Sequence, residues 1–269
     1  KFVLFVIRTY IMFKGLQNIV SGIMAFLSGT ALFLLIHFPS RLVFGIVMVL
    51  WTMLLLCCEW YLRRLRQSKQ TILPVLFLTI FSFVSLASIV EWNFLDWPFI
   101  LFLMGVVFVL FQSIASEQEN LLSVQQKPYR RIMALVLSFD AYALLSTAFA
   151  LTLFFPDIPF WLLTLAGGMI LGAISFMIWK MYFQLQSRQG IAWSFLLALL
   201  MVELIWVMHL LPFGYLVSGF LVVWVWYMLQ LLIRFHFSPR DVVWRKQIWF
   251  LAVNVILYVA LMVFFVRWV

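Results

Sequence analysis

Hydrophobic residues in this chain come in long continuous runs, separated by short polar segments. A bilayer core about 30 Å thick needs about twenty apolar residues at 1.5 Å of helical rise each, and nine runs reach about that length. The predicted spans are 17–37, 42–62, 71–91, 98–116, 132–155, 158–180, 191–211, 213–233 and 248–266. Helices rather than strands are predicted because the runs do not alternate. The predicted fold class is all-α, a polytopic transmembrane helical bundle of about nine helices.

The first residues do not fit a span. Residues 2–13 are apolar but too short, and Arg8 interrupts them at a cost of at least about 2.5 kcal/mol at the bilayer centre. We predict an interfacial helix over 1–14, followed by the bundle over 17–266, within a single integral membrane domain of residues 1–269. Two alternatives stay open, a cytoplasmic extension of the first helix and the end of a span lost upstream.

Composition excludes a soluble fold. Hydrophobic residues make up 67% of the 269 residues and charged residues 10%, against about 25% charged in soluble domains. The mean hydropathy is +1.14. The net charge of +9 could indicate nucleic acid, but the cations lie in small clusters between the apolar runs. We therefore expect the lipid bilayer as the partner and no nucleic acid.

The cations are distributed unevenly between alternate loops. All but two of the eighteen Lys and Arg residues fall on one side, and the exceptions are Arg41 and Arg267. Positively charged loops stay cytoplasmic, so we predict a cytoplasmic N-terminus and a C-terminus on the opposite side. The residues of the basic side are Lys1, Arg8, Lys14, Arg63, Arg64, Arg66, Lys69, Lys127, Arg130, Arg131, Lys180, Arg188, Arg234, Arg240, Arg245 and Lys246.

The outer turns resemble one another. HFPSRLVF, LDWPFILF, FPDIPFWL and LLPFGYLV each place a proline beside apolar residues, namely Pro39, Pro98, Pro159 and Pro212. One interpretation is a two-helix hairpin used four times, with a final helix added. The other is that proline simply suits the first turn of any helix, where its missing N–H has no cost.

Tryptophan positions agree with these boundaries. Nine lie near predicted helix ends, where amphipathic rings prefer the membrane interface. They are Trp60, Trp92, Trp97, Trp161, Trp179, Trp193, Trp244, Trp249 and Trp268. The remaining four are expected to pack between helices or to face lipid tails: Trp51, Trp206, Trp224 and Trp226.

Three polar side chains form a candidate intramembrane site. Asp140 and Glu203 are predicted about 14 and 18 Å deep, and an ionisable group at that depth is by default a functional candidate. The alternative is that each acid is protonated and hydrogen-bonded to a neighbouring helix, a link of about 1 kcal/mol. Asn254, with Tyr258 one turn later, is the third member, and a helix-linking role is favoured for it.

Five arginines form a second candidate site. Arg63, Arg64, Arg66, Arg130 and Arg131 could hold anionic lipid headgroups, each charge contributing about 1 kcal/mol. The same residues are also needed to orient the helices, and that topological role is favoured.

Other chemistry has no visible site. His37, His209 and His236 are too dispersed for a metal site, and the adjacent Cys57 and Cys58 have neither metal-ligand nor disulfide spacing. No metal is therefore expected. GxSxG, P-loop and GxGxxG motifs are missing, so nucleophilic, nucleotide and dinucleotide chemistry have no visible site and no cofactor is expected.

Small residues indicate close helix packing. Gly168 and Gly172 form a GxxxG motif, and the same spacing relates Ala25 to Gly29 and Gly214 to Ser218. A subunit interface is the alternative explanation.

The leading functional prediction is a non-enzymatic membrane protein. It is either a carrier of a small or lipid-like solute or a membrane subunit of a larger complex. The rival is an intramembrane enzyme acting on a lipid or polyprenyl-linked substrate, with arginines binding phosphate and a buried acid as general base. Acids that face a cavity open toward the arginines favour the enzyme. Acids sealed among apolar side chains count against it. A third possibility is a purely structural subunit, which is favoured if the helices enclose no cavity and leave a long apolar flank for a partner.

Overall fold

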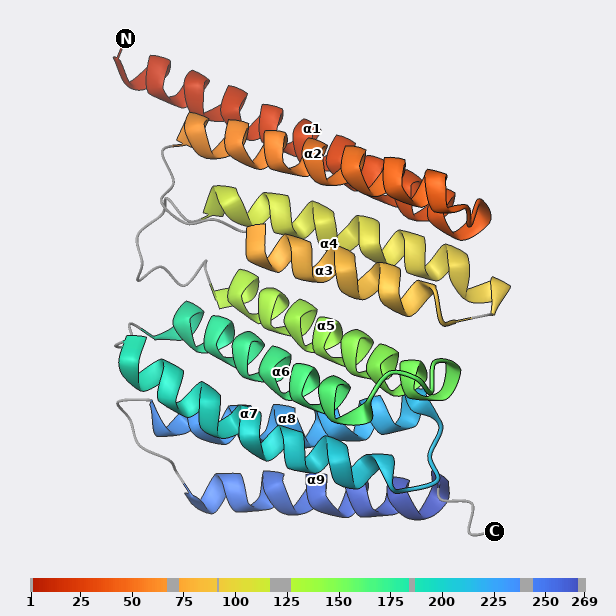
Figure 1. Ribbon diagram of the computed structural model, residues 1–269. Helices are drawn as coiled ribbons and strands as arrows, with labels where there is room; N and C mark the ends of the chain where they lie inside the picture. The colour runs from red at the N-terminus through yellow and green to blue at the C-terminus, as the bar shows by residue number, and fades with distance from the viewer. Residues whose placement is uncertain are drawn as a thin grey trace. The chain divides into compact units, whose positions relative to one another are not determined.

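The computed structural model is all-helical over the residues that it describes, which are 2–66, 73–90, 92–116, 127–183, 187–237 and 244–265. Nine α-helices and one short 3-10 helix lie in these ranges (Figure 1). They are α1 (Phe2–His37), α2 (Arg41–Arg66), α3 (Leu73–Ala87), η1 (Asn93–Leu95), α4 (Asp96–Ser116), α5 (Lys127–Phe154), α6 (Phe160–Tyr182), α7 (Ser187–His209), α8 (Tyr215–His236) and α9 (Trp244–Phe265). The predicted all-α fold is confirmed.

Six of the helices are long and apolar enough to cross a membrane, so the chain is a multi-pass membrane protein. Shorter apolar stretches lie in the other three, α3, α4 and α9. The six candidate spans are Asn18–His37, Arg41–Tyr61, Arg130–Phe154, Phe160–Tyr182, Arg188–His209 and Tyr215–Arg234.

The first helix differs from the prediction. Residues 2–13 are not a separate interfacial helix, because α1 continues without a break from Phe2 to His37. Arg8 does not end the helix, since an α-helix satisfies its backbone hydrogen bonds internally whatever surrounds it. The structure therefore joins these residues to the first helix, and whether they lie at the membrane interface or extend that helix into the cytoplasm stays a prediction.

Two compact units divide the chain, Lys1–Val136 and Leu137–Val269. The first contains α1 to α4 and the start of α5, and the second contains the rest of α5 and α6 to α9. Each is described by itself below, and the single domain expected over 1–269 stays a prediction. The helix ends near Arg64, Lys180, Arg188 and Arg234 are called the basic ends. The ends near the four outer prolines are called the proline ends.

In the first unit, α1 contacts α4 and α2. A Cβ atom built on Gly29 of α1 would lie 2.6 Å from Cγ of Met104 in α4, so the missing side chain brings these helices close. Trp51 of α2 donates an indole hydrogen bond of 2.9 Å to Oγ of Ser28 in α1. The spacing of Ala25, which is buried, and Gly29 therefore marks a packing face within this chain.

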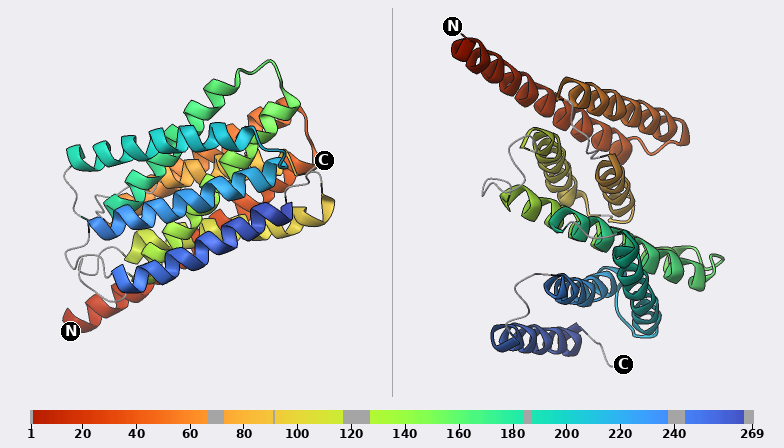
Figure 2. Two further views of the ribbon diagram at one scale, coloured as in Figure 1. Left: turned by 90° about the horizontal axis from the view of Figure 1, so that it is seen from below. Right: turned by 90° about the vertical axis from the view of Figure 1, so that its left-hand side faces the viewer.

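In the second unit, α6 packs most closely on α7. A Cβ atom at Gly172 would lie 2.8 Å from the carbonyl oxygen of Ser194 and 3.0 Å from Cβ of Ala198. A Cβ atom at Gly168 would lie 2.8 Å from the carbonyl oxygen of Ala198. The predicted close packing of the GxxxG motif is confirmed as an interface between two helices of the same chain. α8 and α9 lie side by side in the same unit (Figures 1 and 2).

Three of the four outer prolines lie in connections between helices, and the fourth lies at a helix start. Pro39 lies between α1 and α2, Pro159 between α5 and α6, and Pro212 between α7 and α8, while Pro98 lies in the first turn of α4. The Oγ of Ser40 accepts a 3.2 Å hydrogen bond from the backbone N–H of Val43, which caps α2. Duplication of a hairpin stays a prediction. Gly214 lies before α8 with nothing within 4 Å of a Cβ built on it, so it is no packing glycine.

Candidate functional sites

Asp140 is a sealed acid in the middle of a span. It lies on α5, about 15 Å along the helix from Arg130, and its exposed fraction is 0%. The hydroxyl of Thr147, one heptad along, does not donate its hydrogen bond to Asp140. Its Oγ1 donates a 2.8 Å hydrogen bond to the carbonyl oxygen of Ala143 on the same helix. The side chain of Asp140 is therefore enclosed by protein.

Glu203 has the opposite environment. It is exposed on α7, about 9 Å along the helix from His209, inside the apolar span Arg188–His209. Helical side chains tilt toward the N-terminus, so the carboxyl group lies back toward the centre of the span. Within the described part of the chain it has no hydrogen bond or ion pair.

The side chains around Glu203 form a continuous apolar stripe, here called the α7 flank. Phe195 is 65% exposed and Trp206 is 48% exposed, on either side of the acid along the helix. The flank consists of Phe195, Leu196, Leu199, Leu200, Glu203, Trp206 and Val207, all exposed. Their spacing of three and four places puts them on one helical face.

The two acids differ in their surroundings. Asp140 is buried and Glu203 is exposed, and neither lines either of the cavities described below. A single proton- or cation-binding site made by both acids stays a prediction.

Asn254 links two helices. Its Oδ1 accepts a 3.3 Å hydrogen bond from the indole N–H of Trp224 in α8, and its Nδ2 donates 2.8 Å to the carbonyl oxygen of Phe250. Tyr258, one turn later, donates to Sδ of Met208 in α7 at 3.8 Å. Both side chains of α9 therefore contact neighbouring helices, as the helix-linking interpretation expects.

The candidate headgroup arginines are only partly described. Arg64 is exposed and its guanidinium lies 5.3 Å from the ring centroid of Trp60, and Arg131 is also exposed. Arg130 is half-buried. The side chains of Arg63 and Arg66 lie outside the described residues, so contact of these five residues with lipid headgroups stays a prediction.

Sequence reasoning missed a buried polar cluster between α6 and α8. The indole N–H of Trp226 donates 2.8 Å to Oγ of Ser175, which itself donates 2.8 Å to the carbonyl oxygen of Leu171. The indole N–H of Trp179 donates 3.4 Å to the carbonyl oxygen of Gln230.

Two residues of this cluster are enclosed by the protein. Trp179 lies in the last turn of α6, near a helix end as predicted, but its exposed fraction is 0%, so its ring packs between helices. Gln230 is 1% exposed, and its Oε1 has no hydrogen-bond partner among the described residues. The signal in the sequence was the spacing of four places from Ser175 to Trp179 and from Trp226 to Gln230, which puts each pair on one face of its helix.

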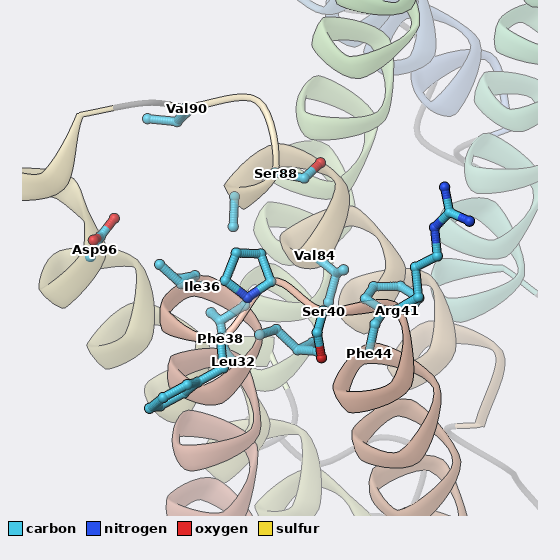
Figure 3. A pocket seen from close by; sticks show the side chains of 13 residues that line it. Leu32, Ile36, Phe38, Ser40, Arg41, Phe44, Val84, Ser88, Val90 and Asp96 are labelled. Carbon is cyan, nitrogen blue, oxygen red and sulfur yellow. The ribbon is translucent and has the colours of Figure 1, made fainter.

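Two cavities are described here, one in each unit. The cavity of the first unit, about 580 Å³, lies at the proline ends (Figure 3). It is lined by Leu32, Leu35, Ile36, Phe38, Pro39, Ser40, Arg41, Phe44, Val84, Ala87, Ser88, Val90 and Asp96. The cavity of the second unit, about 360 Å³, is lined by Tyr142, Leu216, Val217, Phe220, Leu221 and Leu261.

The histidines lie in aromatic contacts at helix ends. His37 stacks on Phe33 with ring centroids 4.1 Å apart, and His209 stacks on Phe160 at 3.7 Å. Over the ranges given above, no three His, Cys, Asp or Glu side chains come together as metal ligands. Cys57 and Cys58 are free thiols.

No family model matches the sequence, and no curated protein or solved structure does.

Proposed function

We propose that this protein is a non-enzymatic membrane subunit of a larger assembly, and that the α7 flank is the surface that binds its partner. The observation that carries the proposal is the exposed carboxyl group of Glu203 within an apolar span. The sequence leaves open a solute carrier or a subunit of a larger complex, and we choose the subunit.

Lipid satisfies the apolar side chains of the α7 flank but not its carboxyl group. Lipid tails are as apolar as leucine, so the exposed Phe195 and Leu199 gain little by exchanging lipid for protein. An acidic side chain near the bilayer centre costs about 2.5 to 3.5 kcal/mol on insertion scales, because hydrocarbon offers it no hydrogen bond. A partner that supplies a donor at this depth removes part of that cost. Glu203 is therefore the residue that distinguishes a protein neighbour from lipid.

The chemistry of the acid indicates the kind of partner. A transmembrane helix with Lys, Arg, Asn or Gln at the depth of Glu203 complements the carboxyl group. A symmetric dimer through the same flank would place Glu203 against its own copy, and two carboxylates at one site cannot both be ionised without repulsion. The proposed partner is therefore a different chain with a donor or cation in its span.

Within the described residues, the enzyme and the carrier have less to support them. A membrane enzyme acting on a lipid phosphate needs an acid that opens toward the arginines of the basic ends, but Asp140 is sealed. A carrier needs a polar passage to the intramembrane acids, and neither described cavity is lined by them.

The test is native extraction of the assembly from membranes into nanodiscs, followed by sizing and crosslinking. A photo-reactive residue at Leu199 should crosslink to one partner chain, and the same residue at Leu50, exposed on α2, should not. Glu203→Leu should weaken the complex about tenfold, the effect expected of one strong intramembrane hydrogen bond of about 1.4 kcal/mol. Glu203→Gln, which still accepts a hydrogen bond, should retain most of it.

Asp157→Asn is the matched control. It removes an acid that is exposed in the connection before α6, outside the span, and should leave the complex unchanged. The proposal is wrong if the chain is extracted as a single copy without partners. It is also wrong if Glu203→Leu leaves the complex and the Leu199 crosslink intact.

A further inference from the structure

The cavity of the first unit is built like a site for an amphipathic molecule. It has apolar walls from α1 and α3, including Leu32, Ile36 and Val84. Charged side chains lie at its rim, Arg41 at the start of α2 and Asp96 at the start of α4. Its volume of about 580 Å³ falls in the range of about 300 to 1,000 Å³ typical of ligand sites.

The two charges of the rim do not neutralise each other. Arg41 and Asp96 lie on opposite sides of the cavity in Figure 3. Neither side chain has an ion pair or a hydrogen bond among the described residues. The first turn of a helix favours a carboxylate, which explains an acid at the start of α4, but it disfavours a cation at the start of α2. Arg41 is also an exception to the charge distribution, since nearly all other cations belong to the basic side.

The depth of these groups matches the headgroup region. Arg41 begins the span Arg41–Tyr61, and His37 ends the span Asn18–His37 that precedes it. Leu32 lies about 7 Å along α1 from His37, so the apolar walls reach the upper part of the hydrocarbon layer. A molecule in this cavity therefore has a charged part at the interface and an apolar part directly beneath it.

We infer that this cavity binds one phospholipid with a zwitterionic headgroup. The guanidinium of Arg41 pairs with the phosphate, for which its planar set of donors is well suited. The carboxylate of Asp96 accepts hydrogen bonds from the ammonium group. The first part of an acyl chain packs against Leu32, Ile36 and Val84. A zwitterion satisfies both rim charges, whereas an anionic lipid without an amine leaves Asp96 unpaired beside its own charge.

The test is native mass spectrometry of the full chain with added lipid. Phosphatidylethanolamine should be retained at least about fivefold more than phosphatidylglycerol, which has the phosphate but no amine. Arg41→Gln should lower retention of both lipids about tenfold, because the phosphate loses its cation. Asp96→Asn should abolish the preference between the two lipids while binding of phosphatidylglycerol persists. Arg188→Gln, which removes an exposed arginine at a basic end outside the five candidate headgroup arginines, is the control and should leave both values unchanged.

A second kind of variant blocks the cavity without removing a charge. Val84→Trp fills the cavity from α3 and should reduce phosphatidylethanolamine retention while both rim charges remain in place. Equal retention of the two lipids by the unmodified protein would overturn the inference, as would unchanged retention in Val84→Trp and Arg41→Gln. Displacement of the lipid by soluble glycerophosphoethanolamine would show that the site recognises a free headgroup instead, and would also overturn it.

Discussion

Replacing both glycines of the α6–α7 interface by alanine should destabilise the protein, although alanine is the better helix former. At Gly172 the new methyl carbon would lie 2.8 Å from the carbonyl oxygen of Ser194, and at Gly168 the new carbon would lie 2.8 Å from that of Ala198. Carbon atoms pack best at about 3.5 to 4.0 Å. The two helices must therefore separate by about 0.5 to 1 Å.

The expected cost follows from this separation. A gap of about 0.5 to 1 Å forfeits a quarter to a half of each dispersion contact across an interface, and overpacking typically costs about 1 to 3 kcal/mol per site. The gain in helix propensity from glycine to alanine offsets about 1 kcal/mol per site. The double variant Gly168→Ala, Gly172→Ala should therefore lose about 2 kcal/mol of unfolding free energy.

Gly45→Ala is the matched control, because it makes the same chemical change where a Cβ atom meets nothing within 4 Å. It should raise the free energy of unfolding by up to about 1 kcal/mol through propensity alone. Both variants can be measured by titration of the detergent-solubilised protein with SDS, followed by tryptophan fluorescence. A double variant as stable as Gly45→Ala would refute the close contact of the α6 and α7 backbones.

Three further substitutions test the polar contacts between helices. Trp226→Phe removes the indole donor to Ser175 and should lower the free energy of unfolding by about 1 kcal/mol in the same titration; an unchanged value would contradict the bond. Asn254→Leu should cost about 0.6 kcal/mol and make the fluorescence of Trp224 more sensitive to quenchers, and equal quenching would count against the link. Asp140→Asn should change the free energy of unfolding by less than about 1 kcal/mol, whereas Asp140→Ala should lower it by at least about 2 kcal/mol. Equal effects of the two substitutions would show that the protein does not require a polar side chain at position 140.

The helices themselves could be predicted from hydropathy because the bilayer fixes their length. The expected first span ends at residue 37, and α1 ends at His37. The expected sixth span covers 158–180, and α6 covers Phe160–Tyr182. A requirement for about twenty apolar residues is a property of the chain alone, so one sequence suffices to find it.

The facing of the helices could not be predicted in the same way. Asp140 and Glu203 have similar apolar neighbours in the sequence, yet one is sealed and the other is exposed. A helix that is apolar on every side has no polar face to indicate which residues point toward its neighbours. Packing against other helices decides that direction, and packing depends on residues far away in the chain.

Buried polar residues were missed for a related reason. Trp179 lies near the end of its helix, as the sequence indicates, but only its contact with Gln230 reveals that the ring is enclosed by protein. Glu59, near the end of α2, is only 3% exposed although it lies close to the arginines of a basic end. Depth along a helix axis can be counted from the sequence, whereas distance from the surface of a unit cannot.

Sidedness labelling with single cysteines tests the membrane arrangement most directly. In a background with Cys57 and Cys58 replaced by alanine, cysteines at Arg64 and Arg188 should react with a membrane-impermeant maleimide from one face of sealed vesicles. Cysteine at Ser40 should react only from the opposite face. Labelling of positions 64 and 188 from opposite faces, or of position 40 from the same face as both, would contradict the multi-pass arrangement from which every proposal above follows.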